Sequence, residues 1–138
     1  MKKFFYDSWL AKKLLIPSCH TITIGPFIFS KKSKDKMDQK TKTHECIHVK
    51  QWCETCFASG ICIGLLAVLF DLSVFWMLFS LIVYYVLYGL EWIIRFCITH
   101  KANLSYDFIS FEQEATNNED DANYIENSSY FSWIKYFK

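Results

Sequence analysis

The residues with the clearest chemical potential are His44-Glu45-Cys46-Ile47-His48, an HExxH sequence. On a helix, positions four apart differ by only about 40° in direction, so His44 and His48 project from one face. Two such imidazoles can bind one zinc ion, and Glu45 borders the same face. Glu45 can then take a proton from the attacking water and pass it to a leaving amine. The motif predicts a zinc site with Glu45 as the general base.

A catalytic zinc needs a third protein ligand, and it must come from another part of the chain. No histidine follows at the HExxHxxGxxH spacing, since Gln51 and Glu54 take the last two positions. The best candidates are Glu112 and Glu114, of which only one can face a metal because they point about 160° apart on a helix. Glu91 is a rival, although Arg95 four residues later favours an ion pair for it.

Several other residues could support the site or pack around it. Gln51 lies seven residues after His44 on the same helix face, where it can orient a ligand. Cys53 and Cys56 form a single CxxC sequence that we interpret as packing residues with reduced thiols. Two tyrosines that flank the Glu112 segment, Tyr106 and Tyr124, are weak candidates for stabilising an oxyanion.

The middle of the chain is apolar. Residues 57–98 contain three charges, and residues 72–90 contain none. Nineteen uncharged residues on a helix are long enough to cross about 30 Å of hydrocarbon. We predict a two-helix transmembrane hairpin, with residues 57–70 in the first arm and the turn at Asp71-Leu72-Ser73. A soluble helical bundle is the alternative, but the sequence after the turn is apolar on all faces.

The charge distribution indicates how such a hairpin is oriented. Residues 1–50 hold eleven lysines and four acidic residues, whereas residues 101–138 hold three lysines and seven acidic residues. Lysine-rich segments favour the cytoplasmic side of a membrane. We therefore expect an integral protein of a bacterial inner membrane with both termini in the cytoplasm. The net charge of +1 argues against a nucleic-acid partner, and the lysines of residues 31–42 suit anionic lipid headgroups.

The 138 residues suffice for one domain, which we predict to be mainly α and membrane-anchored, with a short N-terminal β segment. The predicted elements follow in chain order: an interfacial helix over 1–16, a strand over 21–29, the HExxH helix and first membrane arm over 38–70, the second arm over 72–98, a linker over 101–107, a carboxylate helix over 108–126 and an aromatic tail over 130–138.

An HExxH helix that enters the membrane, followed by a downstream Glu-x-x-Ala, resembles the gluzincin-type membrane metallopeptidases of the CAAX prenyl endopeptidase and HtpX class. In those enzymes the downstream motif is Glu-x-x-Ala-Asp, and its first glutamate is the third zinc ligand. Here Glu112-Gln113-Glu114-Ala115 matches, so the resemblance implies that Glu112 is the third ligand. Thr116 replaces the aspartate, so the supporting contact that this aspartate makes has no counterpart at that position.

The chain also resembles small bacterial membrane proteins that carry an HExxHxxQ helix, an Ile-Ser-Phe-Glu-x-Glu-Ala segment and an aromatic C-terminus. The matching pieces are Thr23–Phe29, His44–Gln51, Glu91–Arg95 and Ile109–Ala115. The resemblance supports the site and implies no substrate.

The leading hypothesis is thus a small integral-membrane zinc metallopeptidase, with zinc on His44, His48 and Glu112. Its partners are membrane lipid and a membrane or peptide substrate. Two alternatives belong to other classes: a non-catalytic membrane protein with a structural or sensing metal, and a membrane adaptor without metal.

Overall fold

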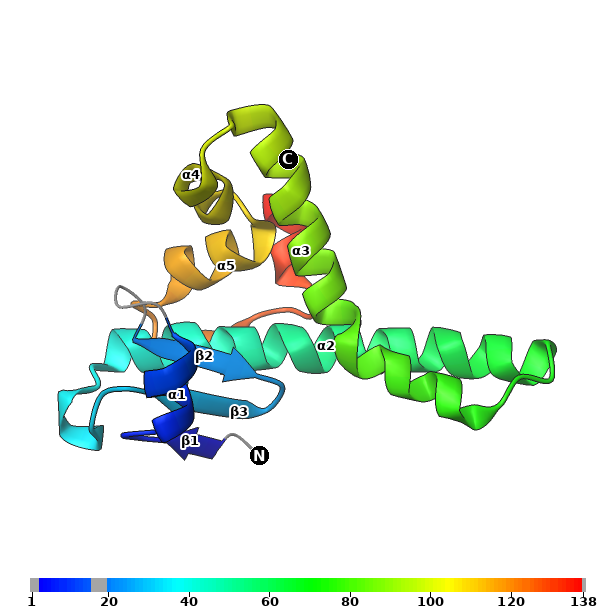
Figure 1. Ribbon diagram of the computed structural model, residues 1–138, viewed down its shortest axis with the longest axis horizontal. Coiled ribbons are helices and arrows are strands. Elements are labelled where there is room, and N and C mark those ends of the chain that lie inside the picture. Colours follow the sequence, from blue (N-terminus) through cyan, green and yellow to red (C-terminus); the bar gives the residue numbers. More distant parts are fainter. Residues whose placement is uncertain (1–2, 16–19, 138) are drawn as a thin grey trace. The chain divides into compact units, whose positions relative to one another are not determined.

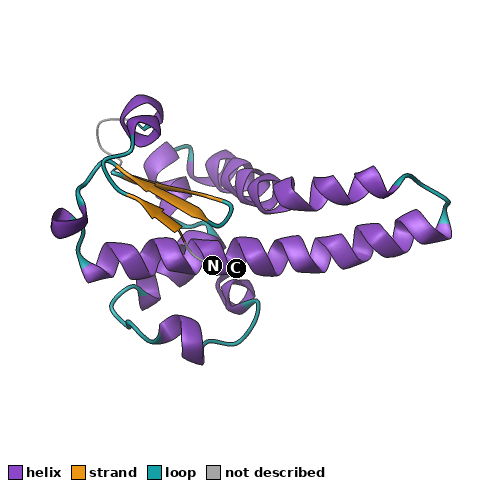
Figure 2. Ribbon diagram, turned by 90° about the horizontal axis from the view of Figure 1, so that it is seen from below, coloured by secondary structure: helices purple, strands orange, loops and turns teal. Residues whose placement is uncertain are grey.

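The computed structural model describes residues 3–15 and 20–137 and is mainly helical, with a short three-stranded sheet near the N-terminus (Figures 1 and 2). The chain forms two compact units. The first comprises Met1–Lys50 and Glu114–Ser129, and the second comprises Gln51–Gln113 and Tyr130–Lys138. Helices α2 (Gln39–Leu69) and α5 (Ser110–Asn118) contribute residues to both units.

The sheet belongs to the first unit and contains a hairpin. Strands β2 (Thr21–Ile24) and β3 (Phe27–Ser30) pair antiparallel, and Gly25 takes the left-handed conformation (φ 57°) in the turn between them. The predicted strand over 21–29 is therefore two strands. Glycine permits this reversal because it has no Cβ to clash in the left-handed region. The second edge of β3 pairs with β1, in the order β1-β3-β2.

The predicted interfacial helix over 1–16 is corrected by the structure. Strand β1 (Lys3–Phe5) runs parallel to β3, and only Trp9–Leu14 forms helix α1. The ring of Phe5 stacks on Phe29 of β3, with 5.0 Å between centroids. Asp7, in the left-handed conformation (φ 50°), separates the strand from the helix. Aromatic residues favour strands when a partner strand can pair with them. Residues 1, 2 and 16 lie outside the described part of the chain.

The core of the first unit forms between β3 and the N-terminal half of α2. Ile28, Met37, Cys46 and Val49 are buried together, and Phe4, Tyr6 and Ile125 pack against them. Cys46, which lies between the two histidines in the sequence, faces this core. The burial of one side of α2 leaves the histidine side of the helix for other contacts.

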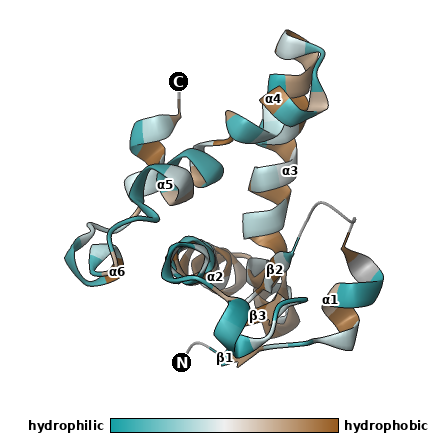
Figure 3. Cartoon of the chain, turned by 90° about the vertical axis from the view of Figure 1, so that its left-hand side faces the viewer, coloured by the Kyte–Doolittle hydropathy of each residue, from teal (hydrophilic) through white to brown (hydrophobic). Residues whose placement is uncertain are grey.

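Helix α2 confirms the predicted element over 38–70. A one-turn 3-10 helix, η1 (Lys34–Lys36), precedes it. Asp38 caps its first turn, because the two carboxylate oxygens accept hydrogen bonds from the backbone N–H and the hydroxyl of Thr41 at 3.2 and 2.8 Å. The first turns are hydrophilic and the later turns hydrophobic (Figure 3). One continuous helix thus carries the HExxH sequence and the first apolar arm.

In the second unit the chain turns after α2 and first runs back beside the end of this helix, and α3 then turns away from it (Figure 1). The turn lies at the predicted place, with Asp71 in the left-handed region (φ 51°). The returning arm starts as the 3-10 helix η2 (Val74–Phe79) and continues as helix α3 (Ser80–Thr99), where the prediction had one arm over 72–98. The indole N–H of Trp52 on α2 donates to the carbonyl of Leu81 at 3.1 Å.

Two segments, Gln39–Leu69 and Val74–Thr99, are long and apolar enough to cross a membrane. The distribution of polarity on α3 is the reverse of that in a soluble helix. Its buried residues are Ser80, Tyr84 and Glu91, whereas leucine, isoleucine and valine side chains on its other faces are exposed. Water disfavours such a surface, and lipid favours it.

The C-terminal region contains shorter and more numerous helices than predicted. The expected linker over 101–107 contains helix α4 (Ala102–Asp107). The carboxylate helix predicted over 108–126 is two helices, α5 and the short α6 (Tyr124–Asn127). The aromatic tail forms the 3-10 helix η3 (Ser132–Tyr136). Its Trp133 packs on Phe111, with 4.4 Å between ring centroids, because this pairing buries both aromatic surfaces.

Candidate metal centre

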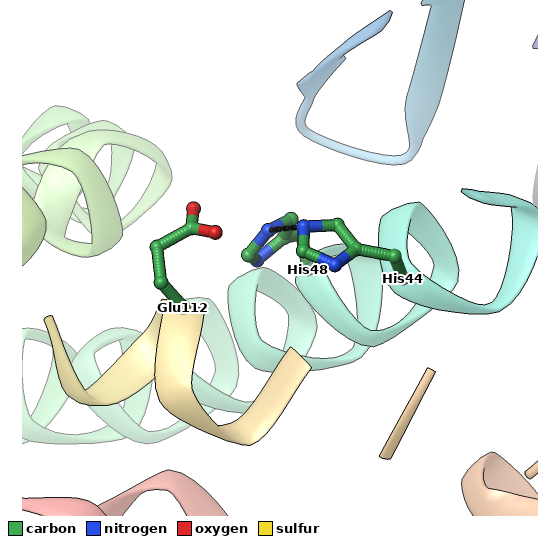
Figure 4. Close-up of side chains that lie close together, drawn as sticks. All are labelled: His44, His48 and Glu112. Carbon is green, nitrogen blue, oxygen red and sulfur yellow. Dashed lines mark hydrogen bonds between the residues drawn. The ribbon is translucent and has the colours of Figure 1, made fainter. Parts of the chain in front are cut away.

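His44, His48 and Glu112 form a group that could hold a metal ion. Each residue offers one ligand atom, and these atoms all lie within 4.8 Å of one another. Figure 4 shows the Glu112 carboxylate on the same side as the two imidazoles. His48 and Glu112 are buried, and His44 is half-buried. The structure thus brings together the three residues that the sequence and the resemblance select as ligands.

The two histidines converge through their Nε2 atoms, which lie 3.1 Å apart. Their rings are nearly perpendicular, with an interplanar angle of 82°. Two ligands about 2.0–2.1 Å from a tetrahedral zinc are separated by about 3.4 Å. The spacing of the imidazole pair is therefore close to the one that a single metal ion requires. Two imidazoles and a carboxylate are the donor types that zinc accepts.

Glu112 is held by a residue that the sequence does not single out. The Tyr88 hydroxyl on α3 donates to its Oε1 at 2.6 Å. A hydrogen bond of this kind orients the carboxylate of a metal ligand. Of the two tyrosines predicted near the site, Tyr106 lies beside Tyr88, with 6.3 Å between ring centroids. Tyr124 donates to Glu114 instead, at 2.9 Å.

Helix α5 is fixed at its first turn by Glu91, the rival ligand. The buried Glu91 carboxylate accepts from the backbone N–H and the hydroxyl of Ser110, at 3.0 and 2.6 Å, and from Arg95 at 3.1 Å. It therefore acts as a cap on α5 and an ion-pair partner, as the spacing to Arg95 predicts. Gln51 adds a second tie, because its amide donates to the Phe111 carbonyl at 2.9 Å. Gln51 thus supports the ligand-bearing helix, which is a supporting role of the kind the sequence suggests for it.

Glu114 points away from the metal group, as helix geometry requires. It is fully buried, accepts from Tyr124 and lies 3.6 Å from the ammonium of Lys50. The cation and the hydroxyl offset the free-energy cost of burying this carboxylate. The two glutamates of the Glu112–Ala115 segment therefore have different tasks.

Glu45, the predicted general base, lies beneath strand β2. The hydroxyls of Thr21 and Thr23 each donate to one of its carboxylate oxygens, the second at 2.6 Å. These threonines project from the same face of the strand because they are two residues apart. Glu45 is 6% exposed and is not among the three grouped ligand residues. Its position is thus set by the sheet, through contacts that no motif in the sequence reveals.

His44 has a further partner, Glu119, which directly follows α5 and belongs to none of the motifs in the sequence. The Nδ1 atom of His44 lies 2.8 Å from Glu119 Oε2, and Lys40 Nζ lies 3.1 Å from the other oxygen. The spacing between His44 and Glu119 in the chain is 75 residues. No local pattern could join them. The one sequence feature that could have indicated Glu119 is its position as a carboxylate near the end of the helix that carries Glu112.

None of the cysteines that the structure describes belongs to the group of His44, His48 and Glu112. Cys46, Cys53, Cys56, Cys62 and Cys97 are free thiols, which agrees with the prediction of reduced cysteines. Cys56 contacts the hydroxyl of Ser80 at 3.7 Å, a packing contact between α2 and α3. Cys19 lies outside the described residues.

Comparison of the chain with protein-family models, with curated proteins and with solved structures finds no match.

Proposed function

We propose that this protein is a small integral-membrane zinc metallopeptidase of the gluzincin type. The convergence of two imidazole nitrogens and one carboxylate within 4.8 Å carries the proposal. The ligands are His44, His48 and Glu112, and the reaction is the hydrolysis of a peptide bond. When bound, zinc supplies Lewis acidity toward the peptide carbonyl and makes the attacking water more acidic.

Glu45 acts as the general base and then as the general acid in this mechanism. Its carboxylate accepts a proton from the attacking water and then delivers it to the amine that leaves. The hydrogen bonds from Thr21 and Thr23 hold the carboxylate in one orientation and still leave lone pairs on both oxygens. Burial around the group excludes bulk water, so the proton passes between fixed positions.

The membrane part of the proposal rests on the apolar arms. Both are long enough to span hydrocarbon, and α3 turns its polar residues inward. The lysine-rich first fifty residues support the part of the proposal that puts both termini in the cytoplasm, at a bacterial inner membrane. A substrate in or near the membrane follows from this location.

Metal content is the first test. Protein purified in detergent is expected to hold about one zinc per chain, and His44→Ala and Glu112→Ala are expected to lose it, because two ligands bind zinc weakly. Glu91→Ala is the matched control. It should lower the stability of the fold by roughly 3 kcal/mol, since Arg95 would lose its buried partner, but the folded fraction should keep zinc. Zinc at background in the wild type would refute the metal site.

Catalysis needs a separate test, which Glu45→Gln provides. The amide cannot accept the proton from water, so cleavage of casein is expected to fall at least about 100-fold while zinc content stays the same. Casein serves here as an unfolded protein substrate.

One observation favours a second candidate, a membrane protein with a structural or sensing metal. Both oxygens of Glu45 already accept hydrogen bonds, which is an arrangement that a purely structural carboxylate also shows. Under this candidate, the wild type would hold zinc and cleave nothing. Casein cleavage that persists in Glu45→Gln would instead show that the peptidase mechanism is wrong.

A further inference from the structure

The two nitrogens of the His44 ring face different partners. Nε2 lies 3.1 Å from the Nε2 of His48, inside the proposed ligand set, and Nδ1 lies 2.8 Å from Glu119 Oε2. A neutral imidazole carries one proton. When Nδ1–H donates that proton to a carboxylate, Nε2 keeps the lone pair that a metal requires.

Glu119 is itself anchored, so the contact is a fixed one. Its other oxygen lies 3.1 Å from the ammonium of Lys40, and its side chain is 15% exposed. Lys40 lies one turn before His44 on α2, so this helix supplies the partners of both oxygens. The three residues belong to the same compact unit. The carboxylate is thus held between a cation and an imidazole.

We propose that Glu119 is a positioning residue for the metal ligand His44, fixing the tautomer and the orientation of its ring. This inference rests on the proposed zinc site and concerns a residue outside the HExxH and Glu-x-x-Ala motifs. Thr116, at the position where the resembling family has aspartate, is exposed. Glu119 lies three residues further along the chain and supplies a carboxylate directly to His44.

The test measures zinc affinity by competition with a fluorescent chelator, using the full-length protein in detergent. Loss of such a supporting carboxylate typically weakens metal binding by about 10- to 100-fold. Glu119→Ala is expected to show this loss. Glu119→Gln should show a smaller one, because its amide oxygen still accepts from Nδ1–H but lacks the charge.

Asp120→Asn is the matched control. Asp120 binds the same lysine as Glu119, with 3.3 Å to Lys40 Nζ, and its side chain is 81% exposed. Its change removes an ion pair of Lys40 but spares the contact with His44, so zinc affinity should stay within about twofold of wild type. The thermal unfolding midpoint of the metal-free protein is measured in parallel. A positioning role lowers the affinity of Glu119→Gln without an equal loss of metal-free stability.

Three results would overturn the inference. One is a folded Glu119→Ala or Glu119→Gln variant with the affinity of the wild type. Another is an equal loss in Asp120→Asn, which would show that the lysine cluster, and not the contact with His44, matters. The third is a wild type that binds no zinc, and only this result also removes the proposed function.

Discussion

At the scale of single residues, the carboxylates of the proposed site are held by partners from distant parts of the chain. Tyr88 orients Glu112, and Thr21 and Thr23 orient Glu45. A proton acceptor works only when its lone pairs point at the reacting water, so these contacts belong to the chemistry as much as to the fold. The threonine pair is the contact that a conservative substitution tests most directly.

Replacing Thr23 with valine removes one donor to Glu45 and keeps the branched shape that suits a strand. We expect casein cleavage to fall about tenfold at unchanged zinc content, because a hydrogen bond to a charged group contributes about 1.5 kcal/mol or more. Thr23→Ser, which keeps the hydroxyl, should retain most of the rate. Equal rates for the valine variant and the wild type would show that Glu45 does not need this donor.

At the scale of elements, helix α2 combines two tasks that are usually separate. Its first turns carry His44, Glu45 and His48, and its later turns are apolar. Its 31 residues contain no proline, and the chain starts the helix with a carboxylate cap at Asp38. The histidines and the apolar arm keep a fixed arrangement only while this helix is continuous. The contribution of its N-terminal cap to the free energy of unfolding can be measured.

Asp38→Ala is expected to lower the free energy of unfolding by about 1 kcal/mol at pH 7. The hydrogen bonds from the side chain and then the backbone of Thr41 lower the pKa of Asp38 below its usual 3.8. A lowered carboxylate pKa stabilises the fold above the unfolded value and loses that contribution as the pH falls through the folded one. The difference between variant and wild type should therefore shrink as the pH is taken below 3.8.

Circular dichroism of the detergent-solubilised protein between pH 3 and 7 follows this change. Asp35→Ala is the control, since Asp35 lies in η1 and does not cap α2. A difference that grows toward acid pH, or an equal effect of Asp35→Ala, would contradict the assignment of the cap.

At the scale of the whole molecule, the exposed apolar side chains are concentrated in the two arms. The exposed large hydrophobic residues include most of the chain between Leu65 and Leu90. An apolar surface of this extent is expected to insert into lipid. Most charged residues precede or follow these arms in the sequence, and only Asp71, Glu91 and Arg95 lie within residues 57–98.

Leu65→Lys tests this insertion, because Leu65 on α2 is 61% exposed in the middle of the first arm. A lysine at the centre of a membrane helix costs about 2.5–3.5 kcal/mol. We expect less of the variant to stay in the membrane pellet after an alkaline carbonate wash.

The control for insertion is Leu104→Lys, since Leu104 lies on α4, outside both apolar segments. It should remain in the pellet like the wild type. Release of the wild type by carbonate would show that the hairpin does not insert.

The elements that the sequence predicts well are those whose pattern is local. The start and end of α2, the turn at Asp71 and the histidine pair follow from spacing, caps and apolar runs within one segment. The N-terminal segment was predicted less well, since Lys3–Phe5 becomes a strand only because β3 offers it an edge. Helices α4 and α6 are only six and four residues long, too short for a periodic pattern.

The sequence by itself determined that His44 and His48 share one face of a helix that continues into an apolar arm, because both features depend on helical periodicity alone. Only the tertiary structure decided how the three candidate carboxylates are used. Glu112 joins the histidines, while Glu91 caps α5 and Glu114 pairs with Lys50. The physical reason is that a carboxylate takes its role from the donors that folding brings to it, and those donors lie up to 64 residues away along the chain, the separation of Lys50 from Glu114.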